Sequence, residues 1–184
     1  MFKIYCFVEN YNYANLCQLY KSINIIYRNY SKSNKLEDLL NLKKFCRKNN
    51  YPLFLSNDLK LSLKLGLDGI YIPSFNKNIN LVKKIKTPRK FKIIGSAHNI
   101  NEINIKIKQG CSEIFISPIF KVKKSNKNLD ICKFNLMTLK YKSNFIALGG
   151  INEKNYKKVL MTKAKGLASI SWAKKNGLRN LRPF

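Results

Sequence analysis

Short apolar runs recur along the chain and alternate with stretches in which apolar and charged residues follow helical spacing. Eight of these runs have the length and β-branched content of buried strands. They lie at residues 4–8, 23–27, 52–55, 69–72, 91–95, 113–117, 145–148 and 166–170. Because near-continuous apolar strands separated by helices are typical of a parallel sheet buried on both faces, we expect an α/β protein with parallel strands.

The segments between the runs predict helices, at residues 36–46, 59–65, 100–109 and 153–162 among others. Two of them run directly into a glycine, Gly66 and Gly110, which is a common helix stop. Eight strand–helix units close into a barrel more naturally than they stack as an open sheet. We therefore predict one domain over residues 1–184, a short (β/α)8 TIM barrel with trimmed helices.

Composition narrows the class of protein without identifying it. A chain of 184 residues with 45% apolar residues is long enough for a real core and has no run that could span a membrane. The first residues resemble a strand rather than a signal peptide. Five scattered cysteines without a CxxC pair argue against a disulfide frame or a zinc site. These features together favour the cytoplasm.

The formal net charge of +27 raises the question of nucleic-acid binding. Lysine supplies 31 of the 36 cationic side chains, however, whereas arginine is preferred for planar recognition of phosphate. The lysines are spread over the predicted helices, and asparagine and isoleucine are also abundant. We interpret most of this charge as solvated helix surface, which attracts phosphorylated metabolites and argues against a nucleic-acid partner.

The strongest local motif is a pair of glycines, Gly149 and Gly150, directly after the seventh predicted strand. Paired glycines let the backbone approach a ligand closely, and the following amides can bind an anion. The eighth strand ends in a second small-residue segment with Ile170 and Ser171. Phosphate sites in barrels of this type are often built from the loops after strands 7 and 8. The alternative for the glycines is a tight turn without a ligand.

Polar residues follow several other predicted strands, and a closed barrel would bring them to one mouth. His98, the sole histidine, suits general acid–base chemistry, or it only bonds a backbone carbonyl. Arg28 is either an anion clamp or a surface cation. Asn57 and Asp58 either hold a metal or cap the next helix, which is the commoner role of such residues.

Six motifs in order along nearly the whole chain resemble the thiamine phosphate synthase/TenI family of (β/α)8 barrels. The motifs are Arg28, residues 65–74 (LGLDGIYIPS), 94–98 (IGSAH), 117–120 (SPIF), 147–151 (ALGGI) and 166–171 (GLASIS). Synthases of this family join a pyrimidine methyl diphosphate to a thiazole phosphate and release pyrophosphate.

The resemblance implies roles for several residues. Gly149, Gly150, Ile170 and Ser171 would bind the phosphate of the thiazole or of the product. Arg28 and Asn57 would face the substrate, and Ser96 would lie near the reaction centre. Lys123 and Lys124, in the loop after strand 6, would neutralise a diphosphate as point charges.

The chain departs from the family pattern where magnesium is bound. The family has carboxylates after strands 3 and 4, at positions that correspond to Asn57 and Asn76 here. Magnesium prefers carboxylates and substrate phosphates, so we expect no cofactor, and Mg²⁺ only if synthase activity is retained. The absence of these two carboxylates fits the TenI branch of the family. Some members of that branch are thiazole tautomerases that use a histidine corresponding to His98.

We therefore expect an enzyme of thiamine biosynthesis or salvage that binds thiazole phosphate or thiamine phosphate, with His98 and Ser96 as catalytic residues. A tautomerase role is slightly favoured over a divergent synthase. A non-catalytic protein that binds thiazole phosphate is a further alternative. The expected partners are phosphorylated thiazole and pyrimidine metabolites, no membrane is expected, and the sequence is compatible with an oligomer.

Overall fold

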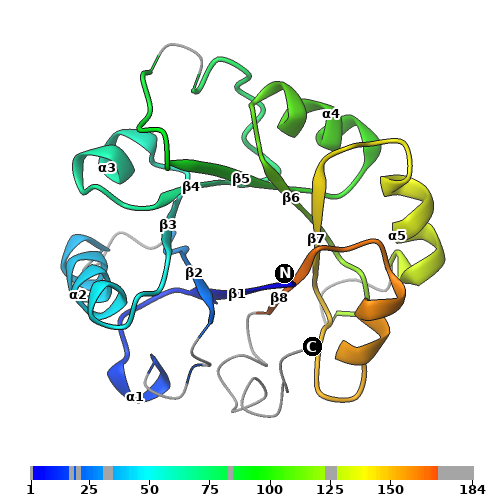
Figure 1. Cartoon of the computed structure of the whole chain (residues 1–184), viewed down its shortest axis with the longest axis horizontal. Helices are drawn as coiled ribbons and strands as arrows, with labels where there is room; N and C mark the ends of the chain where they lie inside the picture. The colour runs from blue at the N-terminus through cyan, green and yellow to red at the C-terminus, as the bar shows by residue number, and fades with distance from the viewer. Residues whose placement is uncertain are drawn as a thin grey trace.

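The computed structural model is a closed barrel of eight parallel strands in sequence order (Figure 1). It describes residues 2–16, 19, 22–30, 35–82, 85–122 and 128–169. The strands are β1 (Lys3–Val8), β2 (Asn24–Tyr27), β3 (Leu53–Ser56), β4 (Gly69–Ile72), β5 (Lys92–Ala97), β6 (Glu113–Ile116), β7 (Asn144–Leu148) and β8 (Gly166–Ser169). The ring closes because β1 pairs with β8 in parallel, with Lys3 opposite Gly166. The predicted barrel is confirmed, and each strand lies within two residues of its predicted bounds.

The helices surround the barrel and are short. They are α1 (Tyr13–Leu16), α2 (Lys35–Lys48), α3 (Leu59–Lys64), α4 (Ile100–Lys108), α5 (Asp130–Thr138) and a 3-10 helix, η1 (Tyr156–Met161). The three helices predicted at residues 36–46, 59–65 and 100–109 are confirmed as α2, α3 and α4, and the fourth, at 153–162, is the shorter η1. No helix in the described part of the chain is long and apolar enough to cross a membrane.

The connection from β4 to β5 departs from a regular alternation of strand and helix. In residues 73–82 and 85–91, which the structure describes, it contains no helix. Asn76 and Asn78 each accept a hydrogen bond from the amide two residues later, at 3.0 Å in both cases. Such side-chain turns compete with helical hydrogen bonds, which is why this asparagine-rich segment does not form a helix.

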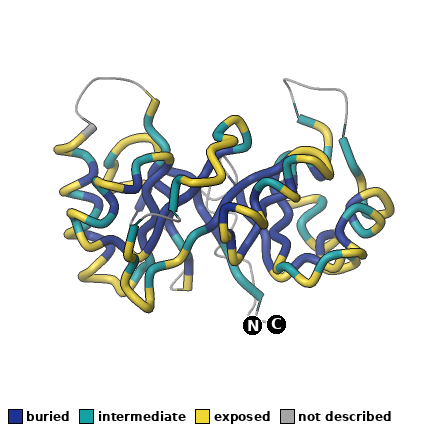
Figure 2. The backbone as a smooth tube through the Cα atoms, turned by 90° about the horizontal axis from the view of Figure 1, so that it is seen from above, coloured by how far each residue is buried: buried dark blue, intermediate teal, exposed yellow. Residues whose placement is uncertain are grey.

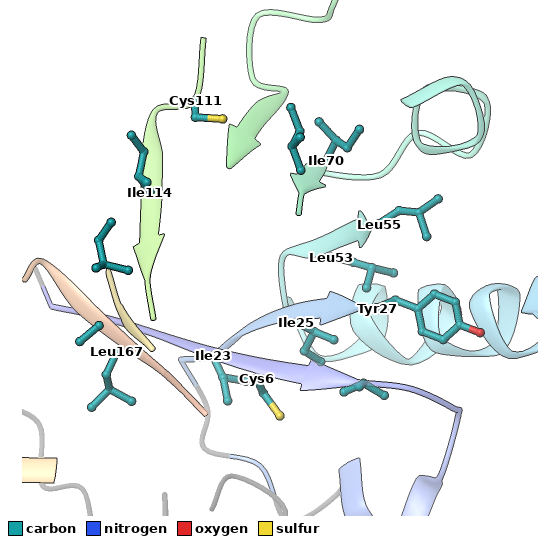
Figure 3. Packing of buried hydrophobic residues seen from close by; sticks show 14 of the residues in the cluster. Cys6, Ile23, Ile25, Tyr27, Leu53, Leu55, Ile70, Cys111, Ile114 and Leu167 are labelled. Atoms are coloured by element: carbon teal, nitrogen blue, oxygen red, sulfur yellow. The ribbon is translucent and has the colours of Figure 1, made fainter. Parts of the chain in front are cut away.

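The core has two layers because successive side chains of a strand point to opposite faces. On β1, Tyr5 and Phe7 point into the barrel, whereas Cys6 and Val8 point toward the helices. Figure 3 shows part of the outer layer, which includes Ile25 of β2 and Ile114 of β6. Figure 2 shows that buried residues concentrate in the strands and exposed ones on the periphery. The amino-terminal part of the barrel interior is filled with aromatic side chains, so no channel runs through it.

The single-domain prediction for residues 1–184 stays a prediction, because residues 170–184 lie outside the described part of the chain.

Candidate active site

A cavity of about 600 Å³ opens at the carboxyl ends of the strands. Segments after β2, β4, β5, β6 and β7 contribute its walls, as expected for a barrel mouth. The lining residues are Arg28, Tyr30, Tyr71, Pro73, Ser74, Phe75, Ser96, His98, Ser117, Pro118, Val122, Leu148 and Gly149. The structure thus brings together Arg28, Ser96, His98 and Gly149, which lie up to 121 positions apart in the sequence (149 − 28).

His98 lies at the start of the loop after β5 and is held at two points. Its backbone amide donates to Glu102 Oε2 at 2.7 Å, and its ring Nδ1 lies 2.7 Å from the backbone oxygen of Ser117. Because a carbonyl oxygen only accepts hydrogen bonds, Nδ1 carries the hydrogen in this contact. Nε2 is then the basic nitrogen of the neutral ring. The expected bond to a backbone carbonyl is present, and the ring also lines the cavity, while the acid–base role of His98 stays a prediction.

Ser96 is buried on the cavity floor, where its hydroxyl is hydrogen-bonded to the hydroxyl of Tyr71. Burial raises the pKa of Tyr71 to about 12, which the Ser96 bond and the nearby Arg28 charge only partly oppose. Tyr71 is therefore a neutral hydrogen-bond donor at physiological pH. Sequence reasoning did not single it out, although the alternation of β4 places this position on the inner face of the barrel.

Arg28 follows β2, and its amide donates to Val8 O at 2.8 Å, which continues the β1–β2 pairing. The guanidinium carbon lies 4.8 Å from the centre of the Phe7 ring, a cation–π contact that holds the side chain over the barrel interior. One nitrogen is 3.6 Å from Glu9 Oε1. Glu9 is 58% exposed, and such an ion pair is weak in water, so the guanidinium remains able to bind an anion.

The glycine pair after β7 adopts left-handed backbone, with φ of 92° at Gly149 and 71° at Gly150. A Cβ at Gly150 would lie 2.5 Å from Phe120 O, so any side chain there would force the backbone to shift. The turn is pinned by Phe120 N, which donates to Gly149 O at 3.1 Å. Among the described residues, no acceptor faces the amides of Gly150 and Ile151. The tight turn is thus present, and Gly149 lines the cavity whereas Gly150 and Ile151 do not; the phosphate role of the turn stays a prediction.

Asn57 and Asn76 meet beside the cavity rather than in its wall. Asn76 Nδ2 donates to Asn57 Oδ1 at 2.7 Å, although the two residues are 19 positions apart. Asp58 caps α3 by accepting from Leu61 N at 3.0 Å, so capping is its role. The described residues that line the cavity include no carboxylate, and the described chain has no cluster of three acidic, histidine or cysteine side chains. These residues do not fit a magnesium site, since Mg²⁺ prefers carboxylates and both amide oxygens already accept hydrogen bonds, that of Asn57 from Asn76 and that of Asn76 from the Asn78 amide.

Behind this amide pair, Lys106 of α4 fixes the segment after β4. Its ammonium group is fully buried and donates to Pro73 O, Asn76 O and Gln109 Oε1 at 2.7, 2.8 and 2.9 Å. Gln109 in turn donates to Asn76 O. Burial lowers the pKa of Lys106 to about 8. Each of the three N–H groups of the Lys106 ammonium thus has an acceptor. These bonds hold the segment that carries Phe75 and Asn76 from outside the barrel. No sequence signal identified this clamp.

Four predicted site residues, Lys123, Lys124, Ile170 and Ser171, lie outside the described residues.

Comparison with known proteins places the chain in a family. Residues 17–173 match the family model described as thiamine monophosphate synthase. The chain belongs to this family. The expected resemblance to thiamine phosphate synthase and TenI proteins is thereby confirmed.

Curated relatives of this family are about a third identical to the chain over the residues that align. A thiamine-phosphate synthase of Prochlorococcus marinus is 35% identical over 71% of the chain and 38% of the relative. One from Methanococcus vannielii is 34% identical over 65% of the chain and 58% of the relative. The chain therefore spans well under two thirds of the length of these relatives.

Solved structures agree on the fold. A thiamine phosphate pyrophosphorylase from Pyrococcus furiosus superposes with a TM-score of 0.77 at 19% identity, covering 97% of this chain and 94% of that one. A phosphoribosylanthranilate isomerase from the same organism gives 0.66 at 15% identity, covering 97% of both chains. At these identities the likeness concerns the barrel alone.

Proposed function

We propose that this thiamine monophosphate synthase family member binds a phosphorylated thiazole, free or as part of thiamine phosphate, and moves a proton on it in the manner of a thiazole tautomerase. The observation that carries the proposal is the His98 ring in the cavity wall, with Nδ1 fixed by Ser117 O. A ring anchored in this way presents one basic nitrogen in a defined direction. The reaction would belong to thiamine biosynthesis or salvage.

Residues in the cavity wall, and the turn of Gly150 and Ile151 beside it, are each given a role in this scheme. The Gly150 and Ile151 amides and the Arg28 guanidinium hold the phosphate and any second anionic group. Nε2 of His98 takes the proton from one ring position and returns it to another, so no proton is gained or lost overall. Ser96 and Tyr71 are neutral donors that stabilise negative charge on the ring in between. No metal or other cofactor takes part in this scheme.

A second candidate is thiamine phosphate synthase itself, which is what both curated relatives are named. Its specific support is Arg28 at the mouth, a cation suited to a diphosphate. The paired amides of Asn57 and Asn76 weigh against it, because they leave the departing diphosphate without a metal ligand. We therefore rank proton transfer first.

Two assays on the same protein distinguish the tautomerase from the synthase. The first incubates thiazole carboxylate phosphate and follows its isomerisation. The second supplies thiazole phosphate, pyrimidine methyl diphosphate and Mg²⁺ and follows thiamine phosphate. We expect turnover in the first and at most a trace in the second. Robust thiamine phosphate formation would reverse the ranking, and tight thiazole phosphate binding without either turnover would indicate a binding protein.

The proton-transfer role is tested by His98→Ala, which should lower kcat of the isomerisation about 10²- to 10⁴-fold. Thiazole phosphate affinity should stay within about threefold, because phosphate binding lies on the amides and Arg28. Ser96→Ala should lower kcat less, and Ser112→Ala is its matched control, an exposed serine away from the cavity. Undiminished turnover by His98→Ala would falsify the role.

The same proposal assigns the positive charge to metabolite attraction rather than to nucleic acid. RNA binding at physiological salt should be weak. Tight binding with a steep salt dependence would contradict this assignment.

A further inference from the structure

We propose that two side chains of α4, Glu102 and Lys106, are positioning residues for the barrel mouth. Glu102 determines how His98 is presented to the cavity, and Lys106 determines where the segment after β4 lies. The two residues should therefore act on different kinetic constants. The kinetic part of this inference rests on the proposed function, whereas the positions of the histidine ring and of the backbone can be measured without it.

Glu102 and Lys106 lie one helical turn apart, on the same face of α4. The helix follows β5 and packs against it on the outside of the barrel (Figure 1). Neither residue is among the described residues that line the cavity. Any effect of these side chains on the site must therefore pass through the segments whose backbone they bind.

Glu102 binds the backbone of His98. In the usual capping box, a carboxylate at this helical position accepts from the amide of the N-cap residue, which is Asn99 here. The Glu102 carboxylate accepts instead from the His98 amide, one residue earlier, at 2.7 Å, and from Asn99 Nδ2 at 3.1 Å. Since Nδ1 of the ring contacts Ser117 O, the backbone and the ring of His98 are each fixed by one bond. Without the backbone bond, the direction of Nε2 would be less well defined.

Lys106 binds the segment after β4 through backbone oxygens. Its ammonium group donates to Pro73 O and Asn76 O at 2.7 and 2.8 Å, and Gln109 donates to Asn76 O and Asn78 O at 3.0 Å. Because the described part of this connection forms no helix, its carbonyl oxygens need donors from elsewhere, and α4 supplies them. Pro73 lines the cavity, so a shift of this segment moves a cavity wall.

These two contacts should give different kinetic defects. A displaced His98 ring slows proton transfer and therefore lowers kcat, while the groups that hold the phosphate stay in place. A displaced segment after β4 changes the wall around the ligand and leaves the His98 ring where it is, so it raises KM. A purely structural role of α4 would lower stability without separating the two constants.

Glu102→Ala should lower kcat of the isomerisation about tenfold and leave KM within about twofold. Glu102→Gln should keep most of kcat, because its amide oxygen can still accept from the His98 amide. The matched control is Glu37→Ala, which removes an exposed first-turn carboxylate from α2 and should change neither constant.

Nitrogen NMR measures the position of the histidine ring directly, because His98 is the sole histidine and gives one pair of ring signals. The untagged original protein and Glu102→Gln should show the tautomer with hydrogen on Nδ1. Glu102→Ala should show a mixture of the two tautomers. An unchanged tautomer ratio in Glu102→Ala would overturn the positioning role of Glu102.

Lys106→Met should raise KM about fivefold and weaken thiazole phosphate binding in calorimetric titration by the same factor, with kcat within about twofold. Hydrogen exchange of the backbone amides after β4 should become faster, while that of α2 stays unchanged. Gln109→Met should change affinity and exchange in the same direction but less, and it provides the test if Lys106→Met folds poorly. Lys108→Met, an exposed lysine of the same helix, is the matched control and should have no effect.

Unchanged exchange after β4 in the Lys106 and Gln109 variants would overturn the positioning role of Lys106. Equal effects of Glu102→Ala and Lys106→Met on kcat and KM would overturn the separation of roles, and both results would leave the proposed function standing. If the original protein neither isomerised nor bound thiazole phosphate, the proposed function would fail. The NMR and exchange measurements would still decide whether the two residues position these segments.

Discussion

The two ends of the barrel differ in what their polar side chains contact. At the amino end, the buried Glu113 carboxylate accepts hydrogen bonds from Tyr5 and from Lys3, so the polar groups there satisfy one another. At the carboxyl end, His98, Ser96 and Arg28 line an open cavity. The same eight strands serve both ends. The comparison suggests that one end contributes stability and the other provides chemistry.

The packing inside the barrel supports this difference between the amino and carboxyl ends. Tyr5 and Phe115 pack edge to face at 4.8 Å, and Phe115 does the same with Tyr71 at 5.6 Å. This aromatic stack fills the barrel from the amino end up to the cavity floor. Tyr71 thus marks the boundary, since its ring belongs to the packed interior and its hydroxyl to the site. Substitutions on either side of it should separate stability from binding.

The largest effect should come from Lys3→Met. It leaves the Glu113 carboxylate, which is only 2% exposed, without its cation. We expect a loss of about 2 to 4 kcal/mol in the free energy of unfolding by urea, somewhat less than for a fully buried pair because Lys3 is partly exposed. The double variant Lys3→Met/Glu113→Gln should recover part of this loss. If Lys3→Met lowered the free energy of ligand binding by the same amount in the folded protein, the amino end would not act on stability alone.

A smaller effect on stability, joined to an effect on binding, is expected at Gly150. Gly150→Ala places a methyl group in left-handed backbone and against Phe120 O. The matched control is Gly110→Ala, with a similar φ of 78° but no atom closer than 4.0 Å. Gly110→Ala should cost about 1 kcal/mol, and Gly150→Ala about 2 to 3 kcal/mol. Only Gly150→Ala should also weaken inorganic phosphate binding. If the two variants bound phosphate equally well, the turn would not be part of the phosphate site.

The smallest effect is a pH dependence that tests the Lys106 clamp. Its folded pKa of about 8 lies below the ordinary 10.5, so between these values the unfolded chain binds the extra proton. This lysine therefore makes the folded state more stable as pH rises from 8 to 10.5, by about 1 kcal/mol per pH unit. Urea unfolding at pH 8.5 and 9.5 should show this gain relative to Lys106→Met.

Neighbouring groups must be controlled in that experiment. Cys111 and Glu102 act on Lys106 by charge, and burial raises the pKa of the Cys111 thiol to about 12. A raised thiol pKa lowers stability as pH rises, opposite to the lysine. Both proteins should therefore carry Cys111→Ala. If the difference between them did not change with pH, Lys106 would not have the lowered pKa that its burial implies.

Much of the fold followed from the pattern of apolar residues. The runs at 69–72 and 113–117 were recognisable because strands buried on both faces are apolar without interruption. The missing helix after β4 was not foreseen, because the competing turns of Asn76 and Asn78 depend on local backbone geometry. Of the site, Arg28, Ser96, His98 and Gly149 were placed correctly at the mouth, since each directly follows or ends a strand.

The sequence by itself determined the eight strands, their order and the residues at their carboxyl ends, because periodicity is a local property. The tertiary structure alone decided which of these residues meet. Tyr71 with Ser96, Asn57 with Asn76 and Lys3 with Glu113 are pairs separated by 19 to 110 positions. Such contacts depend on how the barrel closes and on which atoms then come within hydrogen-bonding reach. No local pattern records that geometry.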